Sequence, residues 1–117
     1  MKSMLKAAIT VAILWAPAVA MADDMKMDMG AGATPADKAF MSSMQKMQKN
    51  MDVKPTGKTD RDFVIMMLPH HQGAVDMAKV ELQYGKDPML RKMATDIVKS
   101  QEQEIGEMKG WLAKNPN

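Results

Sequence analysis

Apolar residues recur at helical spacing in three segments of the chain. The first stripe runs from Phe40 to Met51, the second from Phe63 to Tyr84 and the third from Leu90 to Leu112. Such spacing places side chains on one face of an α-helix, and no segment alternates as a strand does. The pattern predicts an all-α protein. In the first segment, intervals of four, three and four residues separate Phe40, Met44, Met47 and Met51.

The first stripe is preceded by residues that start helices. Thr34 is the predicted N-cap, with Pro35 at the first helical position and Asp37 at the third. The segment 53–58 contains proline and glycine, and we expect the helix to end before it.

The second and third stripes lie close together in the chain. Thr59 or Asp60 is expected to cap the second helix, and Gly85 to follow its last turn. Asp87 and Pro88 then have the types preferred at an N-cap and a first helical position. The short connection predicts an antiparallel hairpin that follows the first helix.

The N-terminal 22 residues have the pattern of a Sec signal peptide. Lys2 and Lys6 precede a short apolar run, and Ala20-Met21-Ala22 is a small-x-small cleavage site. The run is too short for a transmembrane helix. We therefore expect cleavage after Ala22 and a mature protein in the periplasm that is not embedded in the membrane.

Removing this segment changes the net charge. The formal charge of the whole chain is +2, and the loss of two lysines brings it to zero. Such a balance argues against a nucleic-acid-binding protein. The predicted organisation is a signal peptide at 1–22, a methionine-rich tail at 23–33 and a helical domain at 34–115.

Methionine is the unusual component of the composition. The chain has 16 Met, five aromatic residues and no Cys. The absence of Cys removes disulfides, iron–sulfur clusters and CxxC sites. No Gly-x-Ser-x-Gly or phosphate-binding loop is present, so we expect no enzyme activity.

Polar residues interrupt the stripes of the hairpin at one level. If the turn lies at 84–87, His70 is expected to face Gln101 and Glu104, Met66 to face Met108, and Met77 to face Met93. Imidazole and thioether ligands together suit copper, especially copper(I). Glu104 could bind copper(II) directly or orient an imidazole.

His71 forms a second i, i+4 pair, with Met67. Adjacent helical residues point about 100° apart, so both histidines reach one ion only if Pro69 distorts the helix. Otherwise His71 faces solvent or a partner subunit. A single histidine on an apolar stripe is also compatible with a hydrogen-bonded core residue, and methionines there with flexible core filling.

The tail contains three thioethers, in Met25, Met27 and Met29. No core is expected there, and exposed methionines are prone to oxidation. An extended Met-x-Met-x-Met segment could wrap its sulfurs around copper(I) or silver(I), and this would resist acid better than a histidine site.

The hairpin resembles the bacterial "domain of unknown function 305" family, whose copper-related members are called CopM-like. The resemblance covers residues 60–112 and rests on Met67-Leu68-Pro69-His70-His71, on Ala74 and Met77-Ala78, and on Gln101 with Glu104-Ile105. It implies a periplasmic, ferritin-like bundle that binds copper or silver in metal tolerance. Longer members contain more helix, so a homodimer would complete the bundle. The implied metal positions are Met66, Met67, His70, His71, Met77, Met93 and Met108.

These observations predict a copper chelator or chaperone that exchanges copper with a periplasmic donor or acceptor protein. A helical interaction module without metal remains an alternative, as does a bundle that binds b-type haem through His and Met. A di-iron oxidase is excluded, because the chain has no Glu-x-x-His pair.

Overall fold

The structure, a computed structural model, describes residues 30–117. Within them the chain forms three helices and no strand: α1 (Pro35–Asn50), α2 (Thr59–Tyr84) and α3 (Pro88–Lys114). The predicted all-α class is confirmed. The predicted signal peptide, residues 1–22, and the Met25–Met29 segment lie outside the described residues. None of the three helices is long and apolar enough to cross a bilayer.

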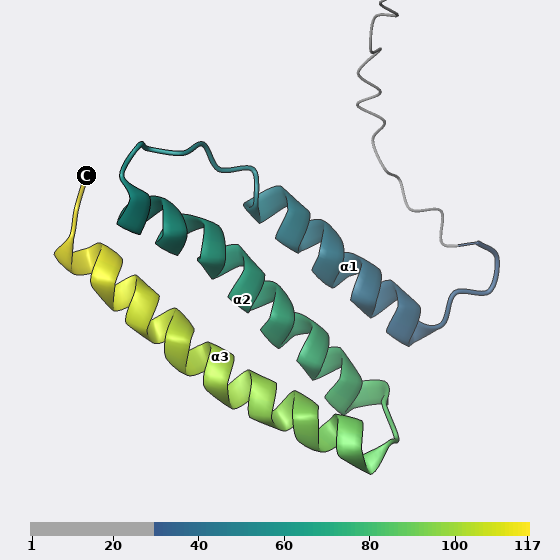
Figure 1. The fold of residues 1–117 in the computed structure, drawn as a ribbon. Coiled ribbons are helices and arrows are strands. Elements are labelled where there is room, and N and C mark those ends of the chain that lie inside the picture. The colour runs from purple at the N-terminus through teal and green to yellow at the C-terminus, as the bar shows by residue number, and fades with distance from the viewer. Residues whose placement is uncertain (1–29) are drawn as a thin grey trace, which may run out of the picture.

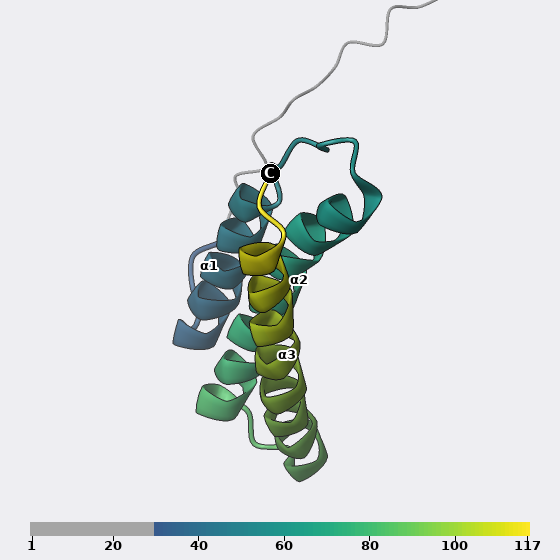
Figure 2. The same cartoon turned by 90° about the vertical axis from the view of Figure 1, so that its left-hand side faces the viewer.

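α2 lies between the other two helices (Figure 1). It is antiparallel to both, and no Cα atom of α1 comes within 8 Å of a Cα atom of α3. The predicted α2–α3 hairpin is therefore confirmed. In Figure 2, turned by 90°, α3 lies in front of α2, and α1 stands to the left of α3.

The helix starts at α1 and α3 follow the predicted capping chemistry. The Thr34 hydroxyl accepts a hydrogen bond from the backbone N–H of Asp37, and the Asp37 carboxylate accepts one from the backbone N–H of Thr34. Asp87 caps α3 by accepting from the N–H groups of Met89 and Leu90. These bonds satisfy donors that have no partner inside a helix.

The predicted cap of α2 is wrong. Lys58 occupies the N-cap position without a side-chain cap. Asp62 instead reaches back to the preceding loop, where it accepts hydrogen bonds from the N–H and hydroxyl of Thr56 and the N–H of Gly57, at 2.6–3.1 Å. Gly85 is the C-cap, with an extended φ of −71° rather than the left-handed conformation typical of a C′ glycine.

The Asp62 contacts predict a dependence of stability on acid. Hydrogen bonds from the Thr56 hydroxyl and then from its N–H hold the pKa of Asp62 below its ordinary value of 3.8. A lowered pKa stabilises the fold above that ordinary value, and this stabilisation is lost as the pH falls through the folded-state pKa. We expect the thermal midpoint to fall between about pH 5 and about pH 3, and to fall less in Asp62→Asn. Thr56→Val removes the hydroxyl donor, so its thermal midpoint should depend less on pH than that of the wild type. If the thermal midpoint fell equally with pH in all three proteins, this role for Asp62 would be contradicted.

The hydrophobic core is small and lies along α2. Val75 is 1% exposed and is the largest side chain that is fully buried. Gly73 lets α1 approach closely, because a Cβ atom built there would lie 2.5 Å from the Sδ atom of Met47. The other buried apolar residues are Val64, Ala78, Val80, Ala94 and Ile105.

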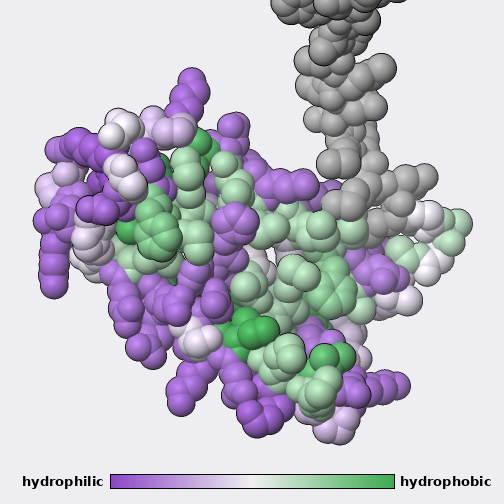
Figure 3. Space-filling model, viewed as in Figure 1, coloured by the Kyte–Doolittle hydropathy of each residue, from purple (hydrophilic) through white to green (hydrophobic). Residues whose placement is uncertain are grey.

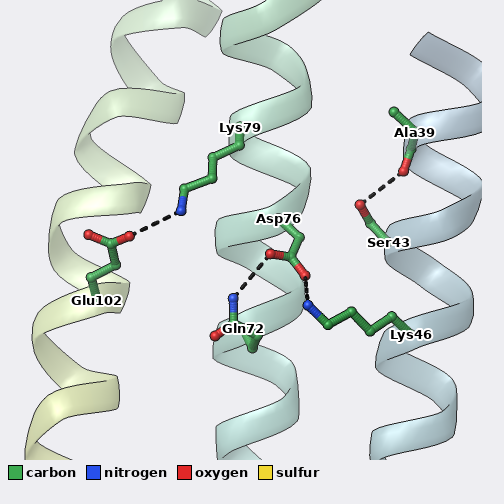
Figure 4. Close-up of polar contacts among 7 residues, drawn as sticks. All are labelled: Ala39, Ser43, Lys46, Gln72, Asp76, Lys79 and Glu102. Atoms are coloured by element: carbon green, nitrogen blue, oxygen red, sulfur yellow. Dashed lines mark hydrogen bonds and ion pairs between the residues drawn. The ribbon is translucent and has the colours of Figure 1, made fainter. Parts of the chain in front are cut away.

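The two open faces of this helical layer differ in polarity. Figures 1 and 3 view one face, on which apolar side chains gather. Figure 4 views the opposite face: the helices keep the left-to-right order of Figure 1, but α2 runs upward, from Gln72 to Lys79, instead of downward. There Asp76 accepts from Gln72 at 3.0 Å and pairs with Lys46 at 3.3 Å, and Lys79 pairs with Glu102 at 3.3 Å. Such exposed pairs each contribute little to stability, so the polarity of that face is their main consequence.

Candidate metal site

The side chain of His71 lies between α2 and α3. The residue is 9% exposed. Its Nδ1 atom donates a hydrogen bond to the carbonyl oxygen of Met67, one turn earlier, at 3.1 Å. Its Nε2 atom contacts a carboxylate oxygen of Glu104 on α3. The Met67 carbonyl thus fixes the orientation of the ring and directs Nε2 across the hairpin.

This arrangement lets Nε2 act in two ways. While it carries a proton, the ring is an imidazolium that forms an ion pair with the Glu104 carboxylate. When the proton leaves, the same nitrogen presents a lone pair toward α3, with a carboxylate beside it. An imidazole whose other N–H is held by a backbone carbonyl is a common arrangement for a metal ligand.

The predicted contact between His70 and Glu104 is wrong by one residue. His70 was expected to face Glu104, but it is exposed, and the adjacent His71 makes that contact. α2 runs unbroken through Pro69, so the proline does not bring the two rings to one point. The reason is that α2 packs on two sides: Gly73 faces Met47 of α1, whereas His71 faces α3.

The His71–Glu104 contact also fixes which methionines share this level. Met67 precedes His71 by one turn on α2, and Met108 follows Glu104 by one turn on α3. Because the helices are antiparallel, both thioethers lie on the same side of the contact, toward the end of the hairpin opposite its turn. Met66 was predicted to face Met108; if the pairing of His71 with Glu104 continues for one turn, Met67 is the residue expected there. We call Met67, His71, Glu104 and Met108 the hairpin box.

The hairpin box combines one nitrogen, one carboxylate and two sulfur donors. Met67 and Met108 are each half-buried, and the Glu104 side chain is 52% exposed. Within residues 30–117, no three His, Cys, Asp or Glu residues lie close enough to hold a metal ion. The remaining donors at this level are therefore thioethers. Gln101, predicted as a further partner, is half-buried, and within the described residues it forms no hydrogen bond to either histidine.

Met77 and Met93 lie elsewhere, near the turn of the hairpin. They line one apolar groove, as the predicted register requires, and they are 40% and 51% exposed. The groove has a volume of about 350 Å³ and includes Phe40 of α1 and a single charged residue, Glu81. It belongs to the apolar face seen in Figure 3. Neither histidine lines it, so these thioethers are separate from the hairpin box.

A second groove opens at the other end of the hairpin and was not predicted as a site. Its apolar lining comes from Phe63, Val64, Met108 and Trp111, and its charged lining from Asp60 and Glu107. In the sequence these apolar residues are part of the ordinary helical stripes. Only the pairing of the two helices shows that a thioether and two aromatic rings meet there.

Comparison with known proteins identifies relatives of the chain. An uncharacterized protein of Acanthamoeba polyphaga mimivirus is 42% identical over 53 residues, a segment that covers 45% of this chain and 35% of the viral protein. The chain thus spans about a third of the length of that relative. The family model described as "Domain of unknown function (DUF305)" matches residues 6–112, a longer range than the 60–112 on which the resemblance was based. The chain therefore belongs to the DUF305 family.

Proposed function

We propose that the protein binds copper through the hairpin box and acts as a periplasmic copper chelator or chaperone. The observation that carries this proposal is the orientation of His71. Its Nδ1 atom is committed to the Met67 carbonyl, and its Nε2 atom is directed at Glu104, with thioethers one turn away on both helices.

The donor set suits both oxidation states of copper. Copper(I) is a soft ion that prefers thioether and imidazole ligands, whereas copper(II) prefers nitrogen and oxygen. His71 would serve either ion, Met67 and Met108 would hold copper(I), and Glu104 would hold copper(II). Silver(I), which resembles copper(I), would use the same sulfurs. The chemistry expected of the protein is binding and release.

Proton exchange gives the site a dependence on pH. A metal ion and a proton compete for Nε2, so binding by His71 weakens as the pH falls. Thioethers carry no proton, so copper(I) held by sulfur alone is less sensitive to acid. The proposed second, weaker site in Met25, Met27 and Met29 would therefore retain copper(I) under acidic conditions.

Metal titration followed by native mass spectrometry tests this function. The full chain, supplied anaerobically with copper(I) or silver(I) at micromolar concentration, is expected to take up one ion tightly and further ions more weakly. The same spectra report whether the protein forms the homodimer expected from its open helical layer. Absence of uptake of either ion would refute the proposed function.

A helical interaction module is the second candidate, favoured by the groove around Met77 and Met93. Exposed apolar surface of this kind often marks a binding surface for another protein. The effect of silver(I) on thermal stability distinguishes the two functions. A metal-binding protein gains thermal stability in the presence of silver(I), because a ligand that binds the folded state stabilises it. A module without a metal site shows no such shift.

A further inference from the structure

The groove at the open end of the hairpin contains Met108, a thioether of the hairpin box. Met108 follows Glu104 by one turn, and Trp111 follows Met108 by three residues, so all three lie along one side of α3. Met108 and Trp111 line the same groove, which has a volume of about 340 Å³. Moving outward along α3, the order is therefore carboxylate, thioether and indole.

We propose that Trp111 is a further copper(I)- and silver(I)-binding residue, whose ring face covers a cation held by Met108. This inference rests on the proposed function. An indole ring attracts a cation through the negative potential of its face, and it does so more strongly than phenylalanine or tyrosine. A half-buried tryptophan beside a soft donor meets the requirement that the cation be partly removed from water.

The charged residues that line this groove are acidic, whereas Lys58 and Arg61 line a neighbouring pocket that Trp111 also borders. Asp60 and Glu107 line the groove from α2 and α3, and its lining contains no lysine or arginine. Two carboxylates at the edge of an apolar groove attract a positive ion electrostatically. Phe63, which is 61% exposed, adds a second ring on the α2 side.

This placement separates the two oxidation states of copper within one hairpin. The inner half of the box, His71 and Glu104, offers nitrogen and oxygen. The outer half, Met67 and Met108 with the Trp111 ring, offers sulfur and an aromatic face. A ring face supplies no lone pair to copper(II), so it favours the soft monovalent ion. Trp111 thereby acts as a determinant of specificity.

Tryptophan fluorescence tests the proposal directly. The chain contains two tryptophans, Trp15 and Trp111, so the full chain with Trp15→Phe has a single reporter. Titration with silver(I) is expected to quench Trp111 emission and to saturate at one equivalent. Trp111→Leu should weaken silver(I) binding by ~2- to 30-fold, the range of a cation–π contact, and Trp111→Phe by less.

Matched variants give the controls. Met108→Leu should remove the fluorescence response, whereas Met77→Leu, in the other groove, should leave it intact. Circular dichroism checks that each variant retains its helices. Silver(I) binding seen by mass spectrometry without any change in Trp111 emission would overturn this inference and leave the proposed function standing. Absence of silver(I) binding altogether would refute both.

Discussion

Replacing His71 with alanine is expected to abolish tight copper(II) binding, with a loss in affinity of at least ~100-fold, more than changes at outer-shell residues typically cost. His71 supplies the only nitrogen donor of the hairpin box, and copper(II) depends on nitrogen and oxygen. Copper(I) uptake should persist in part, because Met67, Met108 and the tail sulfurs remain. Competition with a chromophoric chelator at neutral pH measures both affinities.

His70→Ala is the matched control for this prediction. The two residues are neighbours of identical chemistry, but His70 is exposed and His71 lies between the helices. His70→Ala should leave copper(II) affinity within a few-fold of the wild type, and the double variant should behave like His71→Ala. Equal losses in the two single variants, or an unchanged affinity in the double variant, would contradict the assignment to His71.

Gly73→Val is expected to lower the free energy of unfolding by about 1–3 kcal/mol, the usual cost of overpacking. A Cβ atom at this position would lie 2.5 Å from Sδ, 3.0 Å from Cγ and 3.3 Å from Cβ of Met47. The thioether end of Met47 can rotate away, but its Cβ atom moves only with α1. In a domain of this size the loss corresponds to a decrease in melting temperature of about 4–8 °C per kcal/mol.

Gly106→Val provides the comparison. Gly106 is also helical, and a Cβ atom there meets nothing within 4 Å. Glycine and valine differ little in helix propensity, so stability should change by less than about 0.5 kcal/mol. Urea unfolding followed by circular dichroism measures both variants. If Gly73→Val were as stable as Gly106→Val, the close approach of α1 to α2 would not be important to the fold.

Features that depend on neighbouring residues were predictable from the sequence. The capping box of Thr34 and Asp37, the cap at Asp87 and the hairpin itself follow from short-range signals and a short connection. The contact of Asp62 with Thr56 was not predictable in this way. It depends on how the loop before α2 folds back, and glycine and proline in that loop do not specify one conformation.

The polar contact across the hairpin was predicted at the correct level but on the wrong side of α2. A helix that packs on one partner has one apolar stripe, and its centre indicates the buried face. α2 packs on two partners, so Gly73 and Val75 are both buried although they lie on nearly opposite sides of the helix. The periodicity therefore did not distinguish His70 from His71. Only the structure, through Glu104, does so.

The position of α1 has a consequence for the order of folding. Every residue of the hairpin box lies in α2 or α3, and no Cα atom of α1 comes within 8 Å of one in α3. Contacts between elements that are adjacent in the chain form rapidly, because little entropy is lost in closing a short connection. The proposed metal site would therefore require only the pairing of α2 with α3, whether or not α1 has docked.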